Sequence, residues 1–400
     1  MNTTTSSKKT ADIESARLAA LPPYLFAELA RKTREKIAAG ADVINLGVGD
    51  PDRPTPDFII DAMRHAVGEP RTHQYAPGRG YAEFRTAASD FMQKRFGIAA
   101  DPDRHIIALM GSKDGISHLP LAIVNPSDTV CVPDPGYPVY HSGAIFSGAD
   151  AHPMKLTAAN GWLPVFDDIP PAVRDRARLL WANYPNNPTG AGVDLSFFQS
   201  QVEFCEKHDI IACSDHAYSE IYFDAPPPSL WQAPNADLDT TRAIEFHSLS
   251  KTFNMTGWRI AFAVGHPKIL DALAAVKNNH DSGVFGAVQL AGAAALNNYD
   301  HPDVALMRTV YRERLDALLP GLRAMGCAVD PPKAGFFCWA KCPAGVDSMT
   351  FAKRCLDEAD VVVVPGVGFS AHTDDSFRIA LTVEVDRIEE ATERMQQITW

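Results

Sequence analysis

Lys251 stands in a segment whose residue types could support Schiff-base chemistry. It lies in Ser248-Leu249-Ser250-Lys251-Thr252, and Arg259 follows eight positions later. An unprotonated lysine amine can form a Schiff base with an aldehyde. Ser248, Ser250 and Arg259 offer two hydroxyl groups and a planar cation, the kinds of group that bind a phosphate monoester. A phosphate site beside an amine predicts pyridoxal phosphate as the cofactor.

Three residues upstream of Lys251 are candidates to complete such a site. Asp215 closes an apolar run that predicts a buried strand, and Tyr218 follows three positions later. Asn187 lies in a polar turn after another apolar run. A buried carboxylate needs a cationic partner, and a protonated pyridine nitrogen would be attracted by roughly 4 kcal/mol at about 4 Å and an effective dielectric constant near 20. Asn187 and Tyr218 would hydrogen-bond the phenolic oxygen, while Lys251 would act as general base and acid.

Further candidates lie at the ends of other apolar runs. Gly111-Ser112-Lys113 precedes a helical segment, where backbone N–H groups attract phosphate, although many Gly-Ser turns only begin helices. Tyr137 follows Pro135-Gly136 and is either a ring that stacks on the cofactor or a core tyrosine. Arg378 interrupts a short apolar strand. A buried arginine pairs with a carboxylate, and beside a pyridoxal site we expect the α-carboxylate of an amino acid rather than an internal Asp or Glu.

The elements that must position these residues follow from apolar periodicity. Apolar runs alternate with amphipathic segments between residues 42 and 264, which predicts an α/β domain with a mostly parallel sheet flanked by helices and a ligand at the carboxyl ends of its strands. Longer helical segments and short strands after residue 281 predict a smaller α+β domain. The predicted strands are 42–46, 106–109, 129–132, 178–182, 210–213, 244–246, 259–264, 335–340, 361–364 and 377–381, and the predicted helices include 81–96, 115–124, 195–208, 286–298 and 304–325.

Composition limits the function classes. The 400 residues are 46% hydrophobic and 22% charged, with a net charge of -12 and without a clustered basic patch, so we expect no nucleic-acid or membrane partner. The seven cysteines include no C-x-x-C pair and no histidines at metal-ligand spacing, which favours reduced thiols, a cytoplasmic location and no metal. Residues 1–15 are polar and are expected to form a flexible tail, and no apolar run approaches the roughly 20 residues of a membrane span.

The ordered set of motifs resembles the class I/II aminotransferases of the aspartate aminotransferase fold, fold type I, from about Leu21 to Ile398. The motifs are Gly47-Val48-Gly49-Asp50-Pro51, Gly111-Ser112-Lys113, Asn187-Pro188-Thr189-Gly190, Asp215-x-x-Tyr218, Ser248-x-Ser250-Lys251 and Arg378. Within this superfamily the chain is most similar to the bacterial LL-diaminopimelate aminotransferases. That closer match rests on Leu21-Pro22-Pro23-Tyr24-Leu25-Phe26, His73-Gln74-Tyr75, Phe246-His247-Ser248-Leu249-Ser250-Lys251-Thr252 and Asp281-Ser282-Gly283-Val284-Phe285.

The resemblance implies a pyridoxal-phosphate-dependent transaminase that moves an amino group between an amino acid and a 2-oxo acid such as 2-oxoglutarate. LL-diaminopimelate is one expected donor, which would place the protein in lysine biosynthesis. Aspartate, alanine or another amino acid is an alternative donor, and a lyase or racemase reaction on the same fold is an alternative activity. A non-catalytic binding or regulatory relative is disfavoured because Lys251, Asp215 and Arg378 are intact.

The resemblance also implies residue roles and a domain division. Lys251, Asp215 and Tyr218 would be catalytic. Cofactor-binding positions would be Ser112, Lys113, Tyr137, Asn187, Asp215, Tyr218, Ser248, Ser250, Lys251 and Arg259, together with Tyr75 from a neighbouring subunit, which implies a homodimer with shared sites. Substrate-binding positions would be Arg378, Asn187, Gly47, Tyr24 and Lys113. Asp281-Ser282-Gly283 departs from the asparagine of other members. The expected units are a segment packed on the small domain (16–46), a large domain (47–285) and a small domain (286–400).

Overall fold

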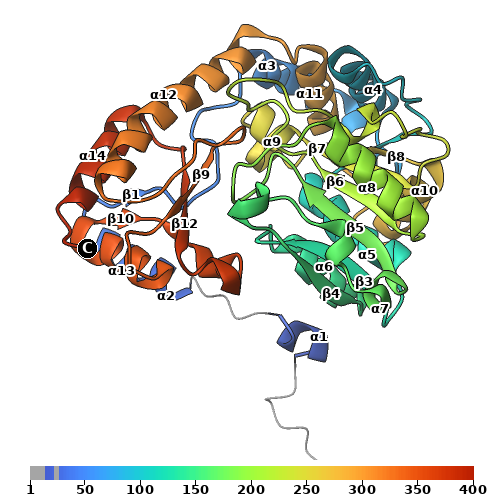
Figure 1. Cartoon of the computed structure of the whole chain (residues 1–400). Coiled ribbons are helices and arrows are strands. Elements are labelled where there is room, and N and C mark those ends of the chain that lie inside the picture. Colours follow the sequence, from blue (N-terminus) through green and yellow to red (C-terminus); the bar gives the residue numbers. More distant parts are fainter. Residues whose placement is uncertain (1–13, 22–26) are drawn as a thin grey trace, which may run out of the picture.

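The apolar runs between residues 106 and 265 form one seven-stranded sheet in this computed structural model, which describes residues 14–21 and 27–400 (Figure 1). Its strands are β2 (Ile106–Leu109), β3 (Thr129–Asp134), β4 (Asp150–Lys155), β5 (Ala177–Asn183), β6 (Ile211–Asp215), β7 (Ala243–Ser248) and β8 (Ala261–Gly265). They are ordered β2-β8-β7-β6-β5-β3-β4. β8 runs in the opposite direction to the other six strands. The predicted mostly parallel mixed sheet is therefore confirmed.

Helices cover both faces of this sheet, which explains why its central strands are continuous apolar runs. Apolar side chains of α5 (Ser112–Ile123), α6 (Val139–Ser147) and α10 (Pro267–Asn278) share one core with Trp181 and Phe246, both fully buried. The opposite core contains side chains of α3 (Asp57–Ala66), α4 (Ala82–Phe96), α8 (Leu195–Lys207) and α11 (Gly286–Asn297). The short helices α7 (Pro171–Arg174) and α9 (Leu249–Thr252) lie in connections between strands.

A second, smaller sheet lies beside the first (Figure 1). It is antiparallel and ordered β11-β12-β9, from β9 (Phe337–Lys341), β11 (Val364–Pro365) and β12 (Ser376–Ala380). A parallel pair, β1 (Ile44–Asn45) with β10 (Val361–Val362), adjoins it. The helices α12 (Pro302–Ala324), α13 (Ser348–Ala359) and α14 (Val385–Gln396) contribute to the same core.

The two N-terminal helices contact different units of the protein. Helix α2 (Ala27–Ala38) reaches the smaller unit through ion pairs from Lys32 to Asp357 and from Lys36 to Asp360. The one-turn helix α1 (Ala16–Ala19) instead contacts α6 of the larger unit, where Arg17 donates to the Phe146 carbonyl at 3.2 Å. Residues 1–13 of the predicted tail and Tyr24 lie outside the described residues.

Three details of the strands differ from the predicted ones. β4 was not predicted because half of its six residues are polar and all but Met154 are at least partly exposed at the sheet edge. The Val361–Val364 run was predicted as one strand but is split: β10 pairs with β1, and β11 pairs with β12. Arg259 was placed in a strand but has φ +55°, and β8 begins only at Ala261. An apolar run indicates that a segment is buried, but it does not determine which strand the segment pairs with.

The predicted boundary before residue 286 divides residues that pack together. Helix α11 lies against α3 and α4 and belongs to the core of the larger unit. Helix α12 begins in that core with Val304 and continues into the smaller core with Met307 and Tyr311. Because α12 joins both cores, we propose a boundary near its start in place of one before residue 286.

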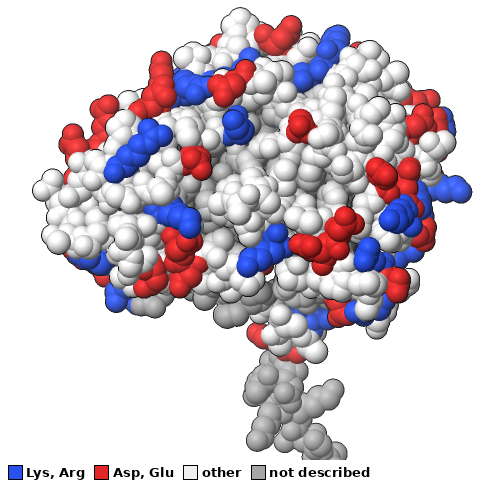
Figure 2. All heavy atoms as spheres, viewed as in Figure 1, with Lys and Arg blue, Asp and Glu red and all other residues white. Residues whose placement is uncertain are grey.

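Three further features concern the surface, the helices and the cysteines of the protein. Acidic and basic side chains are interspersed on the face seen in Figure 2. Within residues 14–21 and 27–400, none of the helices has the length and apolar character to cross a membrane. All seven cysteines are free and buried.

Candidate active site

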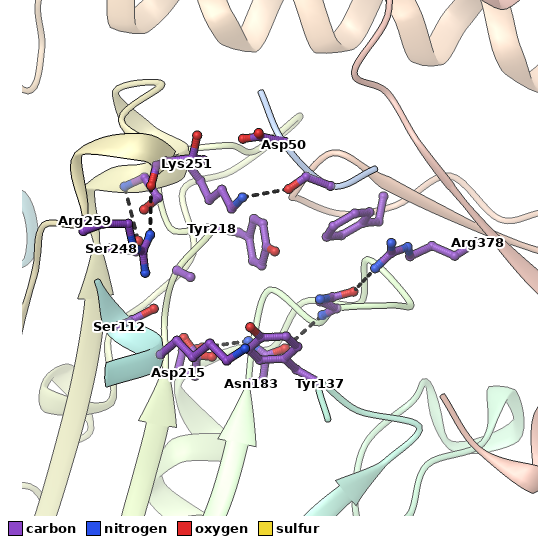
Figure 3. Close-up of a pocket in the computed structure, with 17 residues that line it drawn as sticks. Asp50, Ser112, Tyr137, Asn183, Asp215, Tyr218, Ser248, Lys251, Arg259 and Arg378 are labelled. Atoms are coloured by element: carbon purple, nitrogen blue, oxygen red, sulfur yellow. Dashed lines mark hydrogen bonds between the residues drawn. The ribbon is translucent and has the colours of Figure 1, made fainter. Parts of the chain in front are cut away.

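The carboxyl ends of β2, β3, β5, β6 and β7 and the amino end of β8 contribute residues at one edge of the large sheet, beside the smaller unit. A cavity of about 410 Å³ lies there (Figure 3). Ten of the residues that line it were predicted as cofactor-binding residues: Ser112, Lys113, Tyr137, Asn187, Asp215, Tyr218, Ser248, Ser250, Lys251 and Arg259. Arg378 also lines the cavity, on a strand of the smaller unit. The site is therefore built between the two sheets.

Asp215 ends β6 with its carboxylate buried at the floor of the cavity. One oxygen, Oδ2, accepts a hydrogen bond of 2.6 Å from the hydroxyl of Tyr140, while Oδ1 is buried without a hydrogen-bond partner. Burial raises the pKa of Asp215 to about 6, despite the Tyr140 hydrogen bond, which acts in the opposite direction. No basic side chain in the described part of the chain forms an ion pair with Asp215. Such a carboxylate is suited to a cationic ligand.

Arg378, at another side of the cavity, is a buried cation, in contrast to the buried carboxylate of Asp215 (Figure 3). Its guanidinium donates to Oδ1 of Asn187 at 2.8 Å and to the Gly47 carbonyl at 2.9 Å, and it lies 4.2 Å from the ring centroid of Phe337. Nε is buried and has no partner. Burial lowers the pKa of Arg378 to about 10. Since no carboxylate among the described residues pairs with it, this buried cation is suited to an anionic ligand.

Lys251 lies on α9, one turn after Ser248, whose hydroxyl caps this short helix by accepting from the Ser250 N–H. Its Nζ donates to the Gly49 carbonyl at 2.7 Å. Burial lowers the pKa of Lys251 to about 8, and the nearby cations Arg259 and Arg378 act in the same direction. A larger fraction of this amine is therefore unprotonated near neutral pH than for an ordinary lysine, as a nucleophile requires.

The third side of the cavity combines a helix start with a cation. Gly111 precedes α5 with φ +80°, and a Cβ placed there would lie 2.2 Å from Nη2 of Arg259. Only glycine permits both the backbone angle and this close approach. The Arg259 guanidinium is held by the carbonyls of Thr256, at 2.9 Å, and Met110, at 3.3 Å. The N–H groups of the first turn and this guanidinium suit a phosphate group.

Two predicted residues do not line the cavity. Tyr75 is 90% exposed, as expected of a residue that would act in a neighbouring subunit. Gly47 takes part through its carbonyl, which accepts from Arg378.

Sequence reasoning missed two residues that organise the floor of the site. Tyr140 holds Asp215 and stacks on Trp181 with 5.2 Å between ring centroids. Asn183 donates to the Asp215 carbonyl at 2.9 Å and accepts from the Asn187 N–H at 2.9 Å. Asn183 had a readable signal, a polar residue at the end of an apolar strand. Tyr140 lies in the predicted loop beside Tyr137, but its contact with Asp215 spans 75 positions.

The comparisons with known proteins agree with this arrangement. The family described as Aminotransferase class I and II matches residues 41–395. This chain belongs to that family. It is 48% identical over 383 residues to LL-diaminopimelate aminotransferase 2 of Trichormus variabilis, covering 95% of this chain and 97% of that protein.

Solved structures show the same fold. Substrate-bound BacF from Bacillus subtilis superposes with a TM-score of 0.91 at 35% identity, over 96% of this chain and 98% of that one. A single mutant of the Thermus thermophilus aspartate aminotransferase has a TM-score of 0.89 at 28% identity, over 96% of this chain and 99% of that one. The chain is a pyridoxal-phosphate-dependent transaminase of fold type I.

The cavity of this aminotransferase fits the cofactor that the family uses. Pyridoxal phosphate carries an aldehyde, a pyridine nitrogen that can bind a proton, and a phosphate. Lys251 supplies an amine, and Asp215 supplies a buried carboxylate oxygen without a partner. The turn at Gly111 and Arg259 supply donors for the phosphate. The guanidinium of Arg378, which has no carboxylate partner among the described residues, faces the same cavity.

Proposed function

We propose that this aminotransferase moves the amino group of LL-diaminopimelate to a 2-oxo acid such as 2-oxoglutarate, in lysine biosynthesis. The observation that carries an amino acid substrate is the buried Arg378 guanidinium, which faces the same cavity as Lys251 and has no carboxylate partner among the described residues. An α-carboxylate would pair with it bidentately. The donor itself is inferred from the relatives named LL-diaminopimelate aminotransferase, at 46% to 48% identity.

The proposed cofactor contacts follow the three sides of the cavity. Asp215 would bind the pyridine nitrogen, supported by Tyr140 and Asn183. Asn187 and Tyr218 would bind the phenolic oxygen, and Tyr137 would stack on the ring. The phosphate would be bound by donors around the start of α5 and α9, namely Ser112, Lys113, Ser248, Ser250 and Arg259.

The proposed chemistry depends on Lys251 and Asp215. Bound pyridoxal phosphate supplies an electron-accepting ring that stabilises negative charge at the substrate α-carbon. Asp215 would keep the ring nitrogen protonated. Lys251 Nζ would attach the cofactor in the resting enzyme. Once an amino acid has displaced it, the amine would remove the proton from the α-carbon as general base and deliver it, as general acid, to the carbon of the former cofactor aldehyde, so that the amino group stays with the cofactor. Arg378, with Asn187 and Gly47, would orient the α-carboxylate, and Lys113, which also lines the cavity, would lie near the substrate.

We further propose a homodimer with shared sites. Tyr75 is 90% exposed and Phe285 is 45% exposed, and aromatic side chains of this size are usually covered. Tyr75 would reach the phosphate bound by the neighbouring subunit. This assignment rests on the resemblance and on that exposure.

A half-reaction screen tests the proposed substrate. The enzyme, loaded with pyridoxal phosphate, is mixed separately with LL-diaminopimelate, meso-diaminopimelate, aspartate, glutamate, alanine and lysine. Loss of the absorbance of the lysine-bound cofactor is followed over time. We expect the largest kcat/KM with LL-diaminopimelate. A larger value for aspartate or alanine would replace the proposed donor, and release of ammonia would indicate a lyase.

The role of Arg378 is tested by Arg378→Lys, which keeps the positive charge but loses the bidentate geometry. We expect KM for every amino acid to rise by about ten-fold or more, the equivalent of roughly 1.4 kcal/mol. Arg323, on the surface of the smaller unit at the end of α12, is a matched control as Arg323→Lys, for which KM should not change. An unchanged KM in Arg378→Lys would remove Arg378 from carboxylate binding.

A further inference from the structure

Behind the phosphate side of the cavity lies a buried ion cluster that the proposed mechanism does not use. The Lys277 ammonium, on α10, is 1% exposed and pairs with two carboxylates. One belongs to Asp114 on α5, and the other belongs to Asp281, at 2.7 Å. Nδ1 of His118 lies 2.8 Å from Oδ1 of Asp114 and 4.0 Å from Oδ2 of Asp281.

This cluster is joined to the turn that would bind phosphate. The Asp114 Oδ2 that pairs with Lys277 also accepts the Met110 N–H at 2.9 Å. The carbonyl of the same residue, Met110, accepts from Nη2 of Arg259 at 3.3 Å. The peptide groups before Gly111 are therefore held on one side by Asp114 and on the other by Arg259.

The position of Asp114 creates an electrostatic conflict. It lies in the first turn of α5, where a carboxylate competes with any anion bound to the N–H groups at the helix start. Although burial acts in the opposite direction, the neighbouring His118 side chain and the Lys277 charge lower the pKa of Asp114 to about 2. Its negative charge is therefore permanent at neutral pH and needs compensation.

Asp114, His118 and Asp281 are also close enough together to hold a cation. The Lys277 ammonium, however, already pairs with both carboxylates, so we interpret the cluster as an ion-pair network.

We propose that Lys277 is a positioning residue for the cofactor, which offsets the charge of Asp114 so that the start of α5 can bind the phosphate of pyridoxal phosphate. The proposal rests on the proposed placing of the phosphate at this turn. Lys277 itself does not line the cavity, so it acts through Asp114 and the Met110 peptide. Asp281 is the second carboxylate of this ion pair.

The test compares Lys277→Met with the double variant Asp114→Asn/Lys277→Met. In the single variant Asp114 keeps its charge without compensation, and we expect the dissociation constant for pyridoxal phosphate to rise at least about ten-fold. In the double variant the introduced amide keeps an oxygen that can accept the Met110 N–H but carries no charge, so affinity should return to within about three-fold of the unmodified enzyme. The dissociation constant is measured on the full chain. The loaded protein is diluted stepwise, and the absorbance of the cofactor that remains bound is recorded at each concentration.

A second probe separates the phosphate from the ring. Pyridoxal, which lacks the phosphate, should bind the single variant and the unmodified enzyme equally. The control is Lys268→Met, which changes an exposed lysine on α10, the helix of Lys277. It should alter neither the dissociation constant for pyridoxal phosphate nor that for pyridoxal. Unchanged affinity in Lys277→Met, or affinity in the double variant that remains as weak as in the single one, would overturn the proposal. Failure of the unmodified enzyme to bind pyridoxal phosphate would instead refute the proposed cofactor site.

Discussion

Asp215 is a buried acid in a cavity, and without a cationic ligand its ionisation opposes folding. Its pKa rises from 3.8 to about 6 on folding because burial disfavours the charged form. Between these values the folded protein binds more protons at this site than the unfolded chain does, so the free energy of unfolding falls as pH rises from about 4 to 6. The total contribution is roughly 3 kcal/mol.

Asp215→Asn tests this argument in the cofactor-free protein. The amide does not ionise, so the variant should gain roughly 3 kcal/mol relative to the unmodified protein between about pH 4 and pH 6.5. Denaturant unfolding of both proteins at several pH values measures this difference, in which other titrating groups cancel. A constant difference across the range would show that Asp215 is not a buried, unpaired acid. In the holoenzyme the same variant should lose most of kcat, because the pyridine nitrogen loses its partner.

Lys251 should be unusually reactive at moderate pH. Burial lowers the pKa of its amine from 10.5 to about 8, and the unprotonated fraction reaches one half at that pH. We expect the rate of acylation of Lys251 in the cofactor-free protein to rise through a midpoint near pH 8. Peptide mass spectrometry after brief labelling measures it, with exposed Lys268 followed in the same samples. A midpoint above pH 10 would contradict the assignment. Lys251→Ala should remove the absorbance of the lysine-bound cofactor.

At the scale of elements, the turn from β2 into α5 shows how a backbone requirement serves the site. Gly111 and Gly97 both have positive φ, +80° and +74°. A Cβ at Gly111 would meet Arg259, whereas a Cβ at Gly97 would have nothing within 4 Å. Gly97, with ψ 19°, is left-handed helical, whereas Gly111 has ψ 155°, so the two positions differ both in backbone conformation and in the contact with Arg259.

We predict that Gly97→Ala loses about 1 to 2 kcal/mol of stability from its left-handed backbone. Gly111→Ala should lose at least as much, because φ +80° with ψ 155° is a conformation nearly restricted to glycine. Only Gly111→Ala should also weaken pyridoxal phosphate binding, by about ten-fold or more, because Arg259 must move. Thermal unfolding and cofactor titration measure the two effects. Equal cofactor affinity in both variants would show that the approach of Arg259 to Gly111 does not matter for binding.

At the scale of the whole molecule, the exposed Tyr75 is the residue whose role requires a second chain. If it reaches the phosphate in the neighbouring subunit, Tyr75→Phe should weaken cofactor binding while sedimentation still reports a dimer. Dilution of the unmodified enzyme into the monomer range should release the cofactor in parallel. Met349→Ala, at an exposed site of the smaller unit, is the control. A monomer that retains full cofactor affinity would refute the shared site.

The sequence by itself determined the fold class and most of the residues that line the cavity. Alternating apolar runs are the direct trace of strands buried on both faces, and polar residues just after them mark the edge where a ligand binds. Lys251, Asp215 and Asn187 are legible in this way because each follows such a run. The same logic missed β4, which has no continuous apolar run and lies at an exposed edge, and could not divide Val361–Val364 between two sheets.

Only the tertiary structure decided which groups meet. Arg378 lies 191 positions from Asn187 and 331 from Gly47, yet its guanidinium contacts both. Whether a buried charge is already paired depends on such contacts, and no spacing along the chain records them. Lys277 is a further example, because its ammonium pairs with the carboxylate of Asp114, 163 positions away. Residue types are properties of the chain, but unpaired charges and cavities are properties of packing, which brings distant segments together.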